Sequence, residues 1–542
     1  MLSILAYIFV TTAVILSTLS YFFENRELKK RVAHFPGPKS YPLIGSAYVF
    51  YGDPRYVLNR ITNIFTTYPS PFKLEVGPKI YIGTSDPKQI KNILMSPKAL
   101  EKDDFYRFSQ SWVGNGLLTA PASIWRVHRK LIQPAFNIKV LESFVEVFQK
   151  QATIMANEMS AEVDGKEFKT IHYLSSCTLN VICESAMGVS IISEEEKKKG
   201  YLEESERAII ALSQRGFKVW LHPDIFFNLT KTSKMYYKSV AYLQSITNYI
   251  IRRRRSEIEK ESVTSTFLGQ RKPFLDLLLE LSDNEKKLSN EEIREEVDTM
   301  LFGGHDTTAT IISFVLLMLA LHPDIQAKAY DEIYNNFGSD DPEVSPLDYK
   351  DLLKLEYLER VIKETLRLFP VSPILLRKIT EDLNIGAYTI PKGCSAALSI
   401  FVLHRDEKYW PNPLKFDPDR FLPEEVDKRH PFSFIPFSGG PRNCIESTYA
   451  GAITPGLRNS RAEIKFKMAH RRMIKRNDRP AAIYVYGKPY IINDDGEFVL
   501  EHGKRVMLNI KDGDVLVLPN GEEGVYTERG FMPLIQHPYL PL

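Results

Sequence analysis

Residues 437–451 read FSGGPRNCIESTYAG and place a single cysteine, Cys444, behind two glycines, a proline and an arginine. A lone cysteine is most often a small buried hydrophobic residue. The Gly-Gly-Pro run at 439–441, however, predicts an irregular loop, because these residue types disfavour helix and strand interiors. A thiol at the end of such a loop, two residues after Arg442, is typical of a site that holds a metal centre.

The overall composition limits the classes of protein to which this chain can belong. The chain has 542 residues, 44% of them hydrophobic, so it can bury a large core in one or more domains. Its formal net charge of +3 is too small to favour nucleic acid as a partner. The cysteines are too scattered for a disulfide framework or a zinc site, which favours a reducing, cytosol-facing environment. They are Cys177, Cys183, Cys394 and Cys444.

Residues 1–23 carry no charged side chain. A helix needs about 20 apolar residues to cross the hydrocarbon core of a bilayer, so this segment is predicted to be a transmembrane anchor. A cleaved signal peptide is the alternative, but the apolar run is long and no basic segment precedes it. The basic residues between Arg26 and Arg31 predict that the body of the protein faces the cytosol.

The rest of the chain divides into three predicted parts. Residues 24–45 include the proline-rich run FPGPKSYPLIG and are expected to form a stiff linker. Residues 46–446 are dominated by helical patterns, with strand-like runs such as FKLEVGPKIYIGT at 72–84, so we expect a mainly α fold with small β-sheets. Residues 447–542, the C-terminal tail, read as a divergent β-rich unit broken by turn dipeptides.

Two long helices are predicted with defined ends. The first occupies residues 288–323, where Ser289 and Glu292 form a candidate capping box and a His-Pro pair ends the pattern. The second occupies residues 352–370, where leucine and isoleucine recur at helical spacing.

The centre of the first helix reads FGGHDTT, residues 302–308. Glycine, aspartate and threonine are all poor residues for a helix interior. Close packing against another helix would explain the glycines alone. A local opening of the helix beside a small ligand would explain the whole group, with Asp306 and Thr307 placed to deliver protons.

Two further motifs contain charged residues that are expected to pair. ETLR places Glu364 and Arg367 three positions apart on one helix face. This spacing is also common in surface pairs. FDPDRF holds Arg420 in a rigid coil after Pro418, from which it could bring a second guanidinium to Glu364.

Taken together, these motifs resemble the cytochrome P450 superfamily. FGGHDTT resembles its oxygen-binding helix, ETLR its Glu-x-x-Arg motif, FDPDRF its Pro-Glu-Arg-Phe type element and FSGGPRNC its haem-binding loop, in the family's order. WRVHR resembles the family's Trp-x-x-x-Arg pattern at Trp125 and Arg129. The amino-acid sequences of these stretches are most similar to those of family 4, which includes insect and fatty-acid-hydroxylating members. The resemblance covers residues 1 to about 445.

The resemblance implies a haem-thiolate fold and a set of site residues. Cys444 would be the axial thiolate of haem b, a ligand that favours O–O cleavage. Asp306 and Thr307 would relay protons to iron-bound oxygen, and Glu364, Arg367 and Arg420 would form a structural triad under the haem. The remaining haem contacts would be Trp125, Arg129, Arg377, Phe437 and Arg442, with the arginines binding the propionates.

The chain departs from the family pattern at two places. Many family-4 members have a glutamate, able to form an ester with haem, where this chain has Gly303, so noncovalent haem is expected. The family's glycine two residues after the cysteine is Glu446 here, and residues 447–542 do not match the family's closing helix and hairpin. A mis-joined gene model or chimera and a selected fusion both remain open as explanations of this C-terminal tail.

The resemblance implies a monooxygenase that inserts one atom of O2 into a lipophilic substrate such as a fatty acid, an isoprenoid hormone or a xenobiotic. Electrons would come from NADPH through a membrane-bound flavoprotein reductase, with cytochrome b5 as a further partner, at the cytosolic face of the endoplasmic reticulum. A haem-thiolate isomerase or lyase is one alternative, although such enzymes often lack the acid–alcohol pair. A catalytically inactive relic that no longer holds haem is the other.

Overall fold

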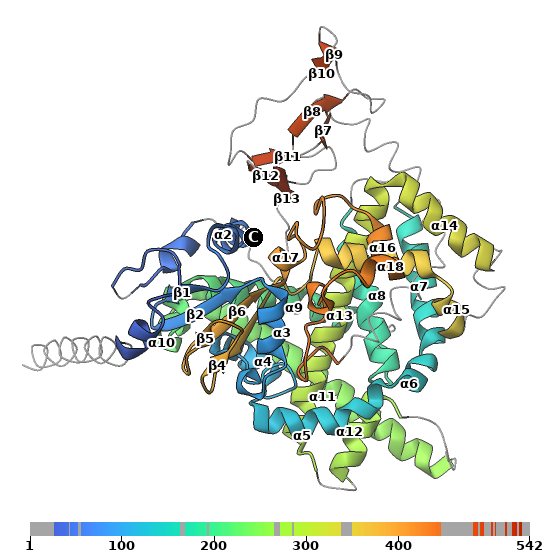
Figure 1. The fold of residues 1–542 in the computed structure, drawn as a ribbon. Coiled ribbons are helices and arrows are strands. Elements are labelled where there is room, and N and C mark those ends of the chain that lie inside the picture. The colour runs from blue at the N-terminus through green and yellow to red at the C-terminus, as the bar shows by residue number, and fades with distance from the viewer. Residues whose placement is uncertain are drawn as a thin grey trace, which may run out of the picture.

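The computed structural model describes residues 26–445, apart from 43, 53–55, 163–167, 192–193, 265–271, 284–286 and 338–348, together with the strand residues between 481 and 533. Helices form most of this body and small sheets lie at one side of it (Figure 1), so the expected mainly α fold is confirmed. The predicted membrane anchor at residues 1–23 lies outside the described residues.

The helix α13, Asn290–Leu321, runs through the middle of the body. It begins with the predicted capping box, in which Ser289 and Glu292 bond to each other's backbone N–H groups, and it ends before His322. It packs against α8 (Thr170–Ser185), α11 (Lys231–Thr264) and α16 (Glu356–Leu368). Its length and hydropathy would suffice for a membrane span, yet it is largely buried among the other helices. It is therefore a core helix that can carry side chains toward an internal site.

Further α-helices surround this core, and many bury apolar side chains against it. They are α2 (Val57–Thr67), α3 (Pro87–Leu94), α4 (Gln110–Val113), α5 (Ala122–Ile132), α6 (Ile138–Glu142), α7 (Val145–Ser160), α9 (Glu195–Phe217), α10 (Asp224–Asn228), α12 (Phe274–Asp283), α14 (Pro323–Phe337), α15 (Tyr349–Leu353), α17 (Ile400–Leu403) and α18 (Pro423–Val426).

The expected local opening of the central helix is wrong. Residues 302–308 are α-helical throughout, in line with the rest of α13. The Thr307 hydroxyl donates to the Gly303 carbonyl oxygen at 2.6 Å. A bond of this kind satisfies the threonine hydroxyl within a regular helix, so these residues do not require a break.

The main sheet has four strands in the order β1-β2-β6-β3. The strand-like run predicted at residues 72–84 forms β1 (Phe72–Val76) and β2 (Lys79–Thr84), which pair as an antiparallel hairpin. β6 (Ser395–Ser399) pairs parallel with β2 and antiparallel with β3 (Ile374–Lys378). All residues of β6 are buried, as expected for a central strand covered on both faces.

The predicted linker, residues 24–45, is not a free spacer. Val32 and Phe35 are buried in the same apolar cluster as strand residues of the sheet. The Pro36 carbonyl oxygen accepts a hydrogen bond from the backbone N–H of Lys73 at 2.7 Å. The described residues of the proline-rich run form no helix, and the run packs on the body.

Several smaller antiparallel pairs complete the described strands. β4 (Leu383–Asn384) pairs with β5 (Thr389–Ile390) in the body. In the tail, β7 (Ala481–Val485) pairs with β8 (Lys488–Ile492), β9 (Leu500–Glu501) with β10 (Lys504–Arg505), and β12 (Glu523–Thr527) with both β11 (Val515–Val517) and β13 (Gly530–Pro533). Residues 446–480 lie outside the described residues.

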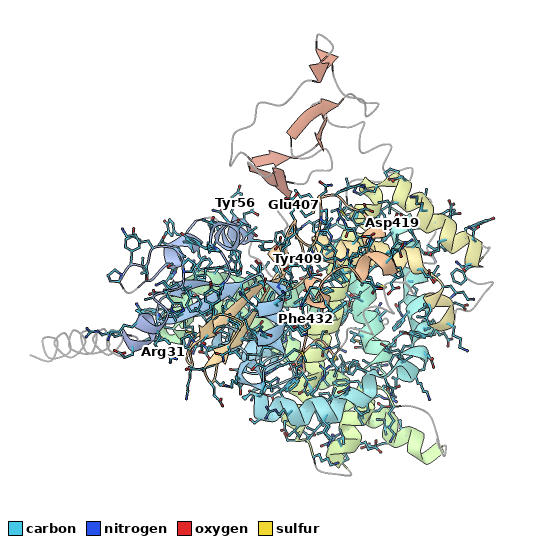
Figure 2. All side chains as sticks on the ribbon, viewed as in Figure 1. Arg31, Tyr56, Glu407, Tyr409, Asp419 and Phe432 are labelled. Carbon is cyan, nitrogen blue, oxygen red and sulfur yellow. The ribbon has the colours of Figure 1, made fainter. Side chains whose placement is uncertain are left out.

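Side chains fill the space between the sheet and the helices (Figure 2). Arg31, labelled in Figure 2 near the start of the described chain, pairs with Asp382 at 2.6 Å and so ties this start to the region around β4. The Cys loop, residues 437–445, follows the short 3₁₀ helix Pro431–Ser433. It is held in place just upstream, where the backbone N–H of Ile435 donates to His404 Nε2 at 3.0 Å.

Candidate active site

A large cavity of about 880 Å³ separates α13 from the Cys loop. Its walls come from α5, α13, α16, β3 and the segment before α4, which are far apart in sequence. The predicted site residues that line it are Trp125, Arg129, Thr307, Arg377, Phe437, Arg442 and Cys444. Most of the remaining lining is apolar, including Phe105, Leu117, Phe217, Phe302, Ile311, Ile374 and Leu375. The fold therefore gathers most of the predicted site around one internal space.

The Cys loop turns sharply to present its thiol to this cavity. Ser438 and Gly440 both have positive φ, of 63° and 73°. A Cβ on Gly440 would lie 2.1 Å from the carbonyl oxygen of Leu94, so only glycine fits there. The turn closes where the backbone N–H of Cys444 donates to the Phe437 carbonyl oxygen at 3.1 Å.

Four cationic side chains line the cavity near the Cys loop. They are Lys102, Arg129, Arg377 and Arg442. Within the described part of the chain, none of the four lies within ion-pair distance of a carboxylate. Arg129, Arg377 and Arg442 donate to carbonyl or amide oxygens. Burial, together with the neighbouring charge of Arg377, lowers the pKa of Arg442 to about 10. Such a cluster is prepared for an anionic ligand.

Lys102 was missed by the sequence analysis. Burial, and then the charges of Arg377 and Arg442, hold the pKa of this amine well below its ordinary value. Its Nζ lies 4.4 Å from the ring centroid of Tyr106. The sequence around it, EKDDF, reads as an exposed charged turn, and only the tertiary fold places Lys102 beside Arg377.

The helix α5 brings Trp125 and Arg129 to the edge of the Cys loop. The guanidinium of Arg129 donates from Nη1 to the carbonyl oxygen of Asn443 at 2.9 Å and from Nη2 to its side-chain Oδ1 at 3.1 Å. The Trp125 ring centroid lies 5.3 Å from the guanidinium carbon of Arg442. The Trp-x-x-x-Arg spacing thus places both residues on the same face of the helix, toward the cavity.

Only one member of the predicted acid–alcohol pair lines the cavity, because neighbouring positions of an α-helix lie on different faces. Thr307 lines the cavity, as does Gly303 one turn before it, where the missing side chain leaves room. Asp306 is partly buried and does not line the cavity. His305, its neighbour, is buried and its Nδ1 lies 2.6 Å from the carbonyl oxygen of Leu301.

The predicted structural triad lies outside the cavity lining. Glu364 and Arg367 are completely buried and form a bidentate pair with N–O distances of 2.7 and 2.8 Å. Arg420 adds an ion pair at 3.5 Å from its Nε to Glu364 Oε1. Its neighbour Asp419, labelled in Figure 2, pairs instead with Arg360 at 3.4 Å. Arg420 lies in the 3₁₀ helix Pro418–Phe421 rather than in the coil expected from the sequence, and the triad therefore joins α16 to this short helix.

A sequence model of the family described as Cytochrome P450 matches residues 35–446. The chain belongs to the cytochrome P450 family. The chain is 37% identical over 426 residues to Cytochrome P450 4V2 of Homo sapiens, covering 76% of this chain and 80% of that protein. It is 34% identical over 462 residues to Cytochrome P450 4c3 of Drosophila melanogaster, covering 82% of this chain and 85% of that protein. The predicted similarity to family 4 is thus confirmed.

Membership identifies this P450 as a haem monooxygenase, and the cavity fits that cofactor. Haem carries two propionates, and the cationic cluster contains donors of the kind that bind carboxylates. The Nε atoms of Arg129 and Arg442 are buried without a hydrogen-bond partner among the described residues, as expected for groups that await a ligand. Cys444 lies in the same wall, and its thiol is the type of soft donor that iron takes in such sites.

Proposed function

We propose that this P450 inserts one atom of O2 into a lipophilic substrate held between α13 and the haem. The observation that carries the proposal is the shared cavity, in which apolar side chains from several elements face Cys444 and Thr307. A preformed, mostly apolar pocket of this size suits a hydrophobic small molecule with few polar contacts. Fatty acids, isoprenoid hormones and xenobiotics all meet that description.

Haem b, bound through the Cys444 thiolate, would supply the oxygen-activating chemistry. The residues of the chain have distinct tasks around it. Lys102, Arg129, Arg377 and Arg442 would hold the two propionates. Because Gly303 has no side chain to form an ester, the cofactor is held without a covalent bond to this helix.

Thr307 and Asp306 would deliver protons to the cavity. Thr307 presents its Oγ1 there and holds it by donating to the Gly303 carbonyl oxygen. To donate elsewhere, the hydroxyl has to exchange that bond, which a side-chain rotation achieves without moving the helix. Asp306, adjacent in sequence and outside the lining, resupplies the proton from the protein side.

Electrons would reach the enzyme from NADPH through a flavoprotein reductase, with cytochrome b5 as a second donor. Glu364, Arg367 and Arg420 would keep the support of the Cys loop rigid while such a partner docks.

The enzyme would work at the cytosolic face of the endoplasmic reticulum membrane, anchored by residues 1–23. A set of exposed apolar residues beside the cavity residue Val219, called the rim here, supports this location. Its members are Ile44, Trp220, Ile225, Phe226 and Leu229, with Leu229 81% exposed. The rim has two parts, Ile44 and the segment 220–229, and these are neighbours. The backbone N–H of Gly77 donates to the Ile44 carbonyl oxygen, and Gly77 also approaches Val219, which lines the cavity and directly precedes the second part. Large exposed apolar residues of this kind favour a lipid surface.

The domain assignment is part of the proposal. Residues 46–446 would form the haem-thiolate domain, after the anchor (1–23) and linker (24–45), and residues 447–542 a tail of other origin. Within the tail, the turn dipeptide at Asn520-Gly521 falls between the paired strands β11 and β12, in keeping with a hairpin.

Reconstitution with a flavoprotein reductase, NADPH and ¹⁸O2 tests the function. The expected result is a product of a lipophilic substrate that contains one ¹⁸O atom, formed only when NADPH is present. A protein that binds haem and rearranges hydroperoxides without NADPH is an isomerase or lyase. A protein that takes up no haem is the inactive relic.

A further inference from the structure

Glu296 is a completely buried carboxylate on α13 that joins three elements of the cavity wall. Its Oε1 lies 2.8 Å from Nδ1 of His128 on α5. Its Oε2 accepts a hydrogen bond from the backbone N–H of Leu117 at 3.1 Å. Burying a carboxylate is costly unless it is paired and hydrogen-bonded, and both oxygens of Glu296 are.

The first element that Glu296 holds is the loop at residues 114–120. Gly114 has a φ of 54°, and a Cβ there would lie 2.0 Å from the side chain of Glu295 on α13. The loop backbone therefore lies flush against the helix, which brings the N–H of Leu117 to Glu296. Since the Leu117 side chain lines the cavity, the same bond also sets part of the wall.

The second element is α5, through His128. The next residue, Arg129, donates two hydrogen bonds to Asn443 in the Cys loop. Any shift of α5 at His128 is thus transmitted to the residue that directly precedes Cys444.

The loop at 114–120 reaches the Cys loop as well. Arg442 donates from Nη2 to the carbonyl oxygen of Ala120 and from Nη1 to that of Leu100 at 2.9 Å. Two lines of contacts therefore leave Glu296, one through α5 to Asn443 and one through the loop to Arg442. They meet just before Cys444 and form a closed ring around one edge of the cavity.

His128 belongs to this ring of contacts, and a positive charge on its imidazole favours the contact with Glu296. Its Nδ1 faces Glu296, and its Nε2 lies 3.5 Å from Oε1 of Glu292. Only the imidazolium can donate at both nitrogens. The hydrogen bond to Glu296 raises the pKa of His128, so the charged pair persists to higher pH than for an isolated histidine.

We propose that Glu296 is a positioning residue for haem: through His128 and Leu117 it fixes α5 and the 114–120 loop against the Cys loop. This rests on the proposed binding of haem beside Cys444. Residues behind the direct contacts of a cofactor tune its retention, and loss of one typically weakens binding by about tenfold or more.

The test compares Glu296→Gln with two matched controls in the haem-loaded, full-length protein. Glu292→Gln removes the half-exposed carboxylate that faces the same imidazole. Asp298→Asn removes a completely buried carboxylate of α13 that bonds instead to Thr247 and Arg294. Three quantities are measured: the rate of haem transfer to excess apomyoglobin, the Kd of 4-phenylimidazole from its spectral shift, and the free energy of unfolding in urea.

Glu296→Gln is expected to transfer haem about tenfold faster and to bind 4-phenylimidazole several-fold more weakly. Glu292→Gln and Asp298→Asn should stay within about twofold of the wild type in both quantities, even though Asp298→Asn lowers the free energy of unfolding. An unchanged transfer rate for Glu296→Gln overturns the proposal, and so does equal acceleration by Asp298→Asn, which would reveal a general loss of stability.

If Glu296→Gln does not fold, His128→Gln carries the same test, because it keeps a donor but loses the charge. Its haem transfer should also accelerate, and an unchanged rate overturns the proposal. The reduced carbon-monoxide spectrum of the wild type reports haem binding separately. A wild type that holds no haem overturns both the proposed function and this inference, whereas a haem-bound wild type with an unaffected Glu296→Gln overturns the inference alone.

Discussion

Glu364 and Arg367 form a completely buried ion pair on one turn of α16, with both oxygens of the carboxylate engaged. The same guanidinium donates to the His404 carbonyl oxygen at 2.8 Å, and Glu364 also accepts from the backbone N–H of Asp417 at 2.9 Å. The pair therefore bonds to two later segments of the chain as well as to itself.

Removing one partner of this pair should be severe. Arg367→Met leaves the Glu364 carboxylate buried without its main partner, and we expect the free energy of unfolding to fall by about 3–5 kcal/mol. Urea unfolding measures this. Lys428→Ala, which breaks an exposed pair with Glu425, is the control and should cost less than about 1 kcal/mol. Similar small losses for both variants would contradict a structural role for the triad.

The glycine of the Cys loop offers a test of local geometry. Gly440→Ala introduces a Cβ 2.1 Å from the Leu94 carbonyl oxygen at a φ of 73°, so the loop must move and haem content should fall. Gly386→Ala is matched, because its φ is 88° but nothing lies within 4 Å of the new Cβ. That control should show only the backbone strain of about 1–2 kcal/mol and full haem content. Equal haem content in both variants would show that the clash is relieved elsewhere.

The hydroxyl of Thr307 should govern coupling. Thr307→Ala is expected to divert NADPH-derived electrons from product to hydrogen peroxide, because the cavity loses its proton-donating Oγ1. The measurement is the ratio of product formed to NADPH consumed. Ser313→Ala is the control. It removes a hydroxyl-to-carbonyl bond of the same kind, from Ser313 to Ala309 in the same helix, at a position outside the cavity lining. Unchanged coupling in Thr307→Ala would remove Thr307 from the mechanism.

The charge on His128 makes stability depend on pH in a defined direction. Its pKa is raised in the folded protein by the hydrogen bond to Glu296, so its stabilisation is complete below the unfolded value of about 6.5 and is lost as pH rises through the folded value. The difference in unfolding free energy between the wild type and His128→Gln should thus be largest near pH 6 and shrink toward alkaline pH. A difference that grows with pH would show that His128 is buried as the neutral form.

Local patterns predicted much of the fold. The capping box of α13, the existence of α16 and the strands β1 and β2 follow from residue patterns over short stretches, so they could be predicted directly. The predicted start of the second helix at residue 352 was wrong, because Tyr349–Leu353 form the separate helix α15 and α16 begins at Glu356. Motif spacing and the family resemblance identified seven of the residues that line the cavity, and among these Trp125 and Arg129 share a helix face whatever the rest of the chain does. Their roles toward haem stay predictions.

Other features depend on contacts between distant segments. Glu296 lies in the charged stretch EEIREEVD, which reads as the solvent-exposed start of a helix. Its burial and its bonds to Leu117 and His128 arise only when these distant segments approach the helix. The position of Lys102 in the cavity wall likewise depends on tertiary contacts that its local sequence does not indicate. The opening expected at Gly303 failed because threonine satisfies its hydroxyl inside a regular helix.

The central claim is that Cys444 ligates haem iron as a thiolate, and the carbon-monoxide difference spectrum of the reduced protein tests it most directly. The wild type should show the red-shifted band of a thiolate-ligated haem. Cys444→Ser should lose that band, while Cys394→Ser, which changes a buried cysteine outside the cavity lining, should keep it. A band that survives in Cys444→Ser, or a wild type that takes up no haem, would contradict the account.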